Sequence, residues 1–216
     1  MCAIAGMIDL KRTDAVVDRM LDTKRRRGPD ETGTAIFDNC CLLHTRLAII
    51  DPAGGTQPMT ICVNGEIYTI VYNGELYNTN EIRNQLQKMG HTFTGHSDTE
   101  VVLHAYAQWG EDCLQQMNGI FAFAVWEKQE RRLFFARDRM GVKPLFYMQH
   151  MNGFIFAAEI KTILAYPGVP RELDAVGVGE IFLLGPGRTP GSGVFRNIFE
   201  LKPGYCGYYF NRRITV

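Results

Sequence analysis

The second residue of this 216-residue chain is a cysteine, so removal of Met1 would leave Cys2 with a thiol and a free α-amine in one residue. A thiol with a pKa of about 8.5 is only a few per cent ionised at neutral pH, and it needs a base before it acts as a nucleophile. An α-amine titrates at about 7.7–8.0 and can be that base without any histidine. Cys2 is therefore a candidate nucleophile, and the alternative is an incidental cysteine in a buried first strand.

Three further segments place polar groups where packing alone would not. Arg46 interrupts a strand-like apolar run, and a half-buried guanidinium needs a carboxylate from the protein or from a ligand. Residues 72–78 interrupt a strand with a small turn that is rich in hydrogen-bond donors. Residues 95–100 place polar groups where a helix begins, and Ser97 or Asp98 could equally be the cap of that helix. Each segment taken singly also has a purely structural explanation.

The elements that would position these residues are strand hairpins with helices in separate blocks. Alternating apolar runs predict strands at 3–8, 33–37, 41–50, 60–63, 66–72, 121–127, 133–136, 145–149, 154–157 and 205–216. Helical spacing predicts helices that begin at a capping Asp14 and at 80–89, 98–109 and 159–165. Asn64-Gly65 is typical of a hairpin turn. This order, without regular βαβ alternation, predicts antiparallel sheets covered by helices, an α+β arrangement.

Taken together, the segments resemble the glutaminase domain of class II glutamine amidotransferases, which are N-terminal nucleophile hydrolases. The matching pieces follow one another in family order: Met1–Gly6, 26–30, His44–Asp51, Tyr72–Asn78, 97–100, 121–124, 137–145 and 158–161, with a weaker match at 194–204. Within that group the sequence Leu47-Ala48-Ile49-Ile50-Asp51 resembles the asparagine synthetase branch, because the sugar and PRPP amidotransferases usually carry a bulkier aromatic residue after the arginine.

The resemblance implies a four-layer αββα sandwich, two antiparallel sheets between helices, and a role for each matching residue. It makes Cys2 the nucleophile, and it makes the Asn73 side chain and the Gly74 N–H the oxyanion hole. It assigns the carboxylate of glutamine to Arg46 and to backbone groups around Ile49 and Ile50, and the ammonium of glutamine to Asp98 with Glu75. The earlier triplet Asn64-Gly65-Glu66 lacks the following Tyr and Asn of the family motif, so we interpret it as a turn only.

Composition narrows the remaining function classes. The chain carries 23 basic and 23 acidic residues, so it has no excess of positive charge that would favour binding to nucleic acid or to an anionic membrane. No stretch of the sequence is long and apolar enough for a membrane span. The six cysteines lack metal-ligand or C-x-x-C spacing, and without a secretory signal we expect reduced thiols, no metal site and a cytoplasmic location.

The function implied is hydrolysis of L-glutamine to L-glutamate and ammonia by one glutaminase domain, residues 1–216, that needs no cofactor for this step. No Ser-Gly-Gly-x-Asp-Ser pyrophosphate loop occurs in the sequence, so we expect the ATP- and Mg²⁺-dependent synthetase half to be absent. The expected partners are L-glutamine and a synthetase domain or subunit that receives the ammonia, with a homodimer possible. The alternatives are a glutaminase that serves another acceptor and an unprocessed interaction module without activity.

Overall fold

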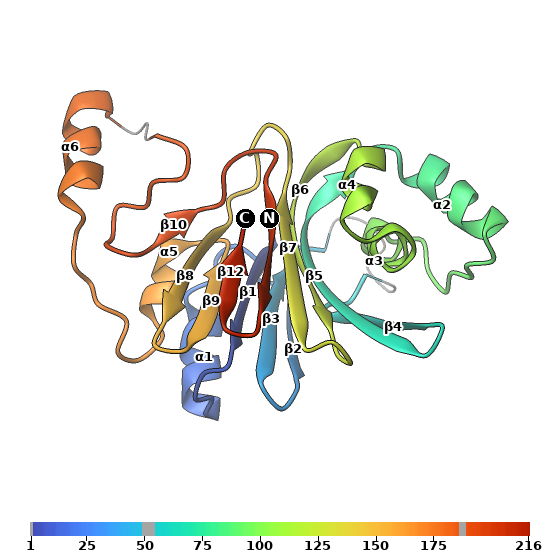
Figure 1. Ribbon diagram of the computed structural model, residues 1–216, viewed down its shortest axis with the longest axis horizontal. Coiled ribbons are helices and arrows are strands. Elements are labelled where there is room, and N and C mark those ends of the chain that lie inside the picture. Colours follow the sequence, from blue (N-terminus) through green and yellow to red (C-terminus); the bar gives the residue numbers. More distant parts are fainter. Residues whose placement is uncertain (1, 49–54, 186–188) are drawn as a thin grey trace.

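Two antiparallel sheets lie face to face between layers of helices in the computed structural model, which describes residues 2–48, 55–185 and 189–216 (Figure 1). In spatial order, the first sheet contains β10 (Phe199–Glu200), β8 (Phe146–His150), β9 (Gly153–Ala157), β1 (Ala3–Ile8), β3 (Cys40–Arg46) and β2 (Glu31–Ile36). The second contains β12 (Arg213–Thr215), β11 (Cys206–Phe210), β7 (Arg132–Arg137), β6 (Gly119–Glu127), β5 (Glu66–Leu76) and β4 (Met59–Val63).

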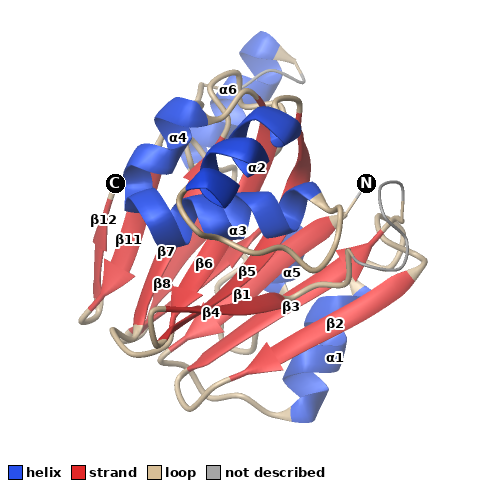
Figure 2. Ribbon diagram, turned by 90° about the vertical axis from the view of Figure 1, so that its right-hand side faces the viewer, coloured by secondary structure: helices blue, strands red, loops and turns tan. Residues whose placement is uncertain are grey.

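Helices cover the outer face of each sheet, which completes four layers (Figures 1 and 2). The first sheet is covered by α1 (Asp14–Asp22) and α5 (Ile160–Leu164). The second is covered by α2 (Thr79–Lys88), α3 (Asp98–Trp109) and α4 (Cys113–Gln116), with a short 3₁₀ turn, η1 (Gly110–Asp112), between α3 and α4. The αββα sandwich predicted from the sequence is confirmed. None of the helices in the described ranges is long and apolar enough to cross a membrane.

Strand β1 contributes side chains both to the core between the two sheets and to the core between the first sheet and its helices. Its side chains alternate between the two faces of the sheet. Ile4 and Ile8 therefore pack between the sheets against residues such as Phe156, while Met7 packs outward with Met20 of α1. Because both faces are covered, all six residues of β1 are buried, and the strand reads as a continuous apolar run.

The structure corrects several details of the predicted elements, and the strand predicted over 205–216 is instead the hairpin of β11 and β12. Helix α1 is capped by Thr13, not Asp14, because the Thr13 side chain accepts the Val16 N–H at 3.4 Å. Strand β3 ends at Arg46, short of residue 50. Strand β5 continues through Leu76, so residues 73–76 are strand and not a turn. An additional helix, α6 (Ala175–Leu184), occupies a stretch for which no helix was predicted.

Helix α6 lies apart from the layers, at the upper left in Figure 1, beyond the β10 edge of the first sheet. Four consecutive apolar side chains at its C-terminal end are exposed, namely Ile181, Phe182, Leu183 and Leu184. The segment that follows returns to the core, because Ile198 and Leu201 are buried. Residues 195–201 are packed in part, because Glu200 is buried as well, whereas Phe199 is exposed.

Candidate active site

One cavity of about 190 Å³ opens where the start of β1, the end of β3, strand β5 and the first turn of α3 converge. Five side chains to which the resemblance assigns a role meet in this cavity, namely Cys2, Arg46, Asn73, Glu75 and Asp98. Its wall consists of Cys2, Arg46, Leu47, Gly55, Gln57, Tyr72, Asn73, Gly74, Glu75, Ser97, Asp98, Thr99 and Lys143. Predicted residues 49 and 50 lie outside the described part of the chain, so the structure does not address them.

Cys2 precedes β1 and lies at the cavity wall, half-buried. Its thiol donates to the Leu47 carbonyl oxygen at a distance of 3.7 Å. Strand β1 pairs with β3 so that Ala3 is opposite Thr45, and one further step of this register places Cys2 beside Arg46. All six cysteines are free thiols, but Cys2 alone among them lines this cavity.

Arg46 is the last residue of β3, and its side chain is buried. Its Nη1 lies 3.1 Å from Oε2 of Glu31, the residue opposite it on β2. The backbone that follows is held by Asp30, which donates its N–H to the Arg46 carbonyl and accepts the Ala48 N–H at 2.8 Å. The guanidinium therefore lines the cavity with one cross-strand carboxylate partner already in place.

Asn73 and Gly74 lie in the middle of the β5–β6 pairing, opposite Ala122 and Phe121. The Asn73 side chain is buried, and its Nδ2 has no hydrogen-bond partner in the described part of the structure. A buried amide donor without a partner is costly unless a ligand accepts it. At Gly74 a Cβ atom would lie 2.6 Å from the Ile120 carbonyl oxygen, so this position admits only glycine.

Asp98 is the first residue of α3 and follows Ser97, whose side chain caps the helix by accepting the Glu100 N–H. Its Oδ2 accepts two hydrogen bonds of 3.1 Å from β5, one from the Tyr72 hydroxyl and one from the Leu76 N–H. Burial raises the pKa of Asp98, and these two hydrogen bonds act in the opposite direction. The carboxylate is thus fixed between α3 and β5, at the cavity wall.

If Asp98 binds a cationic group, we expect the affinity for that ligand to depend on pH in a defined direction. A carboxylate with a raised pKa takes up its proton at a higher pH than an ordinary aspartate, so binding weakens as pH falls through that raised value. Replacing Tyr72 by phenylalanine removes a hydrogen bond that lowers the pKa, and the loss of affinity should begin at still higher pH. Titrations of substrate affinity against pH test this, with Tyr68→Phe, on the same strand but outside the cavity, as control.

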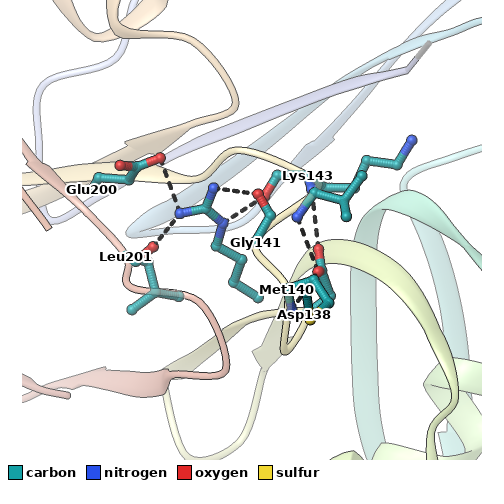
Figure 3. Close-up of polar contacts among 8 residues, drawn as sticks. Asp138, Met140, Gly141, Lys143, Glu200 and Leu201 are labelled. Carbon is teal, nitrogen blue, oxygen red and sulfur yellow. Dashed lines mark hydrogen bonds and ion pairs between the residues drawn. The ribbon is translucent and has the colours of Figure 1, made fainter. Parts of the chain in front are cut away.

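A polar network holds the loop that brings Lys143 to the cavity (Figure 3). The buried Asp138 carboxylate accepts backbone N–H groups from Phe121, Met140, Val142 and Lys143 at 3.0–3.2 Å. The buried Arg137 guanidinium donates to the carbonyls of Gly141, Lys143 and Leu201 at 2.6–2.7 Å, and it pairs with Glu200 at 3.0 Å. Figure 3 shows the Lys143 side chain extending away from this network.

The structure adds wall residues to the set proposed from the sequence. Tyr72 and Lys143 stood inside matching motifs but received no role, whereas Gln57 gave no local signal because its partners are distant in sequence. Glu75 lies at the cavity with its side chain exposed. In the described residues, no group of three His, Cys, Asp or Glu side chains has an arrangement that could hold a metal ion.

Comparison with known families and proteins gives a consistent result. Residues 1–215 match the family model described as glutamine amidotransferase domain. The chain is 48% identical over 210 residues to asparagine synthetase (glutamine-hydrolysing) 3 of Bacillus subtilis. This match covers 95% of the chain and 34% of that protein. It is 35% identical over 223 residues to a putative asparagine synthetase 2 of Methanocaldococcus jannaschii, covering 94% of the chain and 42% of that protein. The chain thus spans well under half the length of these relatives.

Among solved structures, the fold is similar to that of a glutamine PRPP amidotransferase from B. subtilis, with a TM-score of 0.72 at 16% identity. That match covers 99% of this chain and 48% of the other. At this identity the similarity concerns the fold, and it agrees with the sandwich of two sheets described above.

Proposed function

The chain belongs to the glutamine amidotransferase domain family, and from this premise we propose that it hydrolyses L-glutamine to L-glutamate and ammonia. The observation that carries the proposal is the single cavity shared by the Cys2 thiol, the Arg46 guanidinium, the Asn73 amide and the Asp98 carboxylate. Its volume of about 190 Å³ is below the roughly 300–1,000 Å³ of sites for drug-sized ligands, which suits one amino acid.

Each group in the cavity has a counterpart in glutamine. The guanidinium of Arg46 takes the α-carboxylate through charge-assisted hydrogen bonds, and the Asp98 carboxylate takes the α-ammonium. The side-chain carbonyl then faces Cys2, with its oxygen directed at the unpartnered Nδ2 of Asn73 and at the Gly74 N–H. Such donors act most strongly on the negative charge that develops on this oxygen in the transition state.

The reaction proceeds through a thioester. The Cys2 sulfur bonds to the side-chain carbonyl carbon, and the thiol proton passes by way of the α-amine to the leaving nitrogen, which departs as ammonia. Water then attacks the thioester, which releases glutamate and restores the thiol. The α-amine is a base only after Met1 has been removed, because an amide nitrogen does not accept a proton. No cofactor takes part in these steps.

The experiment that tests this function is an ammonia-release assay on the purified chain, with the loss of Met1 verified by intact mass. We expect equal amounts of glutamate and ammonia from glutamine, without ATP or Mg²⁺. If a mass-verified chain that begins at Cys2 releases no ammonia, the glutaminase function is wrong, and the chain is better described as an interaction module.

Replacing Asn73 by alanine should lower kcat much more than it raises KM, because an oxyanion donor acts mainly in the transition state. Loss of one such donor lowers kcat by about 10²–10³-fold in other enzymes. Asn64→Ala, in the β4–β5 turn outside the cavity, should leave both constants unchanged. A large rise in KM with constant kcat would instead make Asn73 a ground-state binding residue.

We further propose that the ammonia serves ATP-dependent asparagine synthesis by a synthetase domain or subunit. The proposal is supported by the asparagine synthetases among the relatives, whose length the chain covers only in part. ATP and Mg²⁺ would act in that partner and not in the cavity described here. The cytoplasmic location and the homodimer stay predictions.

A further inference from the structure

Gln57 adds a second link between β5 and α3, which Asp98 already joins through the Tyr72 hydroxyl and the Leu76 N–H. Its side chain is buried, in the loop that precedes β4. The amide oxygen accepts the backbone N–H of Tyr72 on β5 at 2.6 Å. The amide nitrogen donates to the Thr99 hydroxyl in the first turn of α3 at 3.2 Å. We call this bridge from Tyr72 N–H to Thr99 hydroxyl the Gln57 clamp.

The two anchor points of the clamp stand next to residues proposed for the reaction. Tyr72 immediately precedes Asn73 and Gly74, which supply the oxyanion donors, and Thr99 immediately follows Asp98, which takes the ammonium of glutamine. A shift of either anchor would therefore change the distance between the oxyanion donors and the Asp98 carboxylate. This distance must match the length of glutamine.

The local pairing explains why a side chain is needed here. The β4–β5 ladder begins with Met59 opposite Ile70, and continuing this register places residue 57 opposite Tyr72, beyond the end of the ladder. The Tyr72 N–H is buried there, and the Gln57 amide oxygen accepts it in place of a strand carbonyl. A buried N–H left without an acceptor would cost more than the bond gains, so the strand would shift to find one.

The first sheet fixes the clamp from the other side. A Cβ atom on Gly33 of β2 would overlap the backbone carbonyl oxygen of Gln57, so the two backbones are in close contact. On β3, burial lowers the pKa of His44 to about 3, and the neutral ring donates from Nε2 to the Tyr72 carbonyl at 3.3 Å. The peptide groups on both sides of Tyr72 are therefore held by buried side chains from outside β5.

We propose that Gln57 is a positioning residue for the glutamine site, which sets β5, with its oxyanion donors, at the correct distance from Asp98 on α3. This rests on the proposed function. Gln57 acts through the two anchors and not on the reacting atoms. Because a misplacement of about 1 Å can cost about 10²-fold in rate, a partial loss of alignment should be measurable without loss of the fold.

A double-mutant cycle tests the clamp. Gln57→Met keeps the length of the side chain but removes both hydrogen bonds, and we expect about a tenfold rise in KM together with about a tenfold fall in kcat. Thr99→Val removes the α3 anchor alone, so KM should rise about three- to tenfold with kcat nearly constant. The double variant should match Gln57→Met, because Thr99 has no clamp left to lose. Additive effects, or a Thr99→Val variant with unchanged KM, would overturn the proposal.

The chain offers control residues of the same types at exposed positions outside the cavity. Gln129 makes the same kind of amide bridge at the far end of β5, accepting the Ile67 N–H at 3.0 Å and donating to the Gly65 carbonyl at 2.9 Å. The Thr60 hydroxyl bonds to that of Thr69 at 2.9 Å, between β4 and β5. Gln129→Met and Thr60→Val should leave KM and kcat unchanged, and thermal unfolding of all variants reports any general loss of stability.

A binding measurement separates the clamp from the chemistry. In a Cys2→Ala background, calorimetry with L-glutamine gives an affinity that needs no turnover, and adding Gln57→Met should weaken it about tenfold. If the Cys2→Ala parent binds glutamine and Gln57→Met does not change the affinity, the clamp is wrong while the glutaminase function stands. If the parent binds no glutamine, the proposed function falls and the clamp with it.

Discussion

Replacing Cys2 by alanine should abolish ammonia release from glutamine, with a fall in kcat of about 10³-fold or more, because loss of the nucleophile removes the thioester route altogether. The fold should persist. Cys2 precedes β1 and is only half-buried, and its thiol makes one weak hydrogen bond to Leu47. Steady-state kinetics and thermal unfolding on the same preparations provide the two measurements.

Two control variants separate the thiol from its position. Cys62→Ala removes an exposed thiol on β4 and should keep full activity. Inserting one glycine before Cys2 keeps the thiol but turns its nitrogen into an amide, so activity should be lost because the base is lost. If Cys2→Ala retained activity after controls for contamination, the nucleophile assignment would be wrong. Activity in the glycine insertion would instead show that another group is the base.

Local sequence signals predicted much of this fold, and the β4–β5 hairpin shows why. Asn64 and Gly65 both adopt positive φ angles, 53° and 85°, which is the conformation that favours Asn-Gly in a two-residue hairpin. The helix over 98–109 was also predicted from local signals, because serine is a preferred N-cap residue and Ser97 caps this helix. In both cases the determinants lie within a few residues of one another.

A non-local contact explains one wrong prediction, and a local apolar run explains another. Asn73 and Gly74 are typical turn residues, and a turn was expected, but pairing with β6 keeps them in a strand. There Gly74 is required by the close approach of the Ile120 carbonyl, and not by a turn. Helix α6 was missed because its C-terminal end is a continuous apolar run without helical periodicity.

The residues of the candidate site likewise fall into those that sequence motifs predicted and those that only the structure shows. Motifs placed Cys2, Arg46, Asn73, Gly74 and Asp98, and the structure brings them to one cavity. Gln57 could not be found in this way, because it bonds to residues 15 and 42 positions away in the sequence. A resemblance transfers the groups that face a ligand, whereas the supporting contacts depend on how the layers of the sandwich pack.

Arg46 is the other residue for which we expect a large effect, and the structure gives it two possible roles. As a ligand for the α-carboxylate of glutamine, it would make charge-assisted hydrogen bonds worth about 1.5–3 kcal/mol. Because about 1.4 kcal/mol corresponds to a tenfold change in affinity, Arg46→Met should raise KM about 10- to 100-fold. As a structural partner of Glu31, it would instead stabilise the β2–β3 pairing, and its loss would lower stability without a specific effect on KM.

Substitutions at both ends of the ion pair decide between these roles. Glu31→Gln removes the carboxylate partner but keeps the guanidinium in the cavity, so the ligand role predicts a KM that is unchanged or lower, since one competitor for Arg46 has gone. The matched control is Arg132, which pairs with Glu127 at 2.8 Å in the same cross-strand geometry on β7 and β6, away from the cavity. Arg132→Met should lower the unfolding temperature while KM stays constant. If Arg46→Met behaves like Arg132→Met, with a lower unfolding temperature and an unchanged KM, Arg46 is a structural residue, and the α-carboxylate of glutamine must be bound by other groups of the wall.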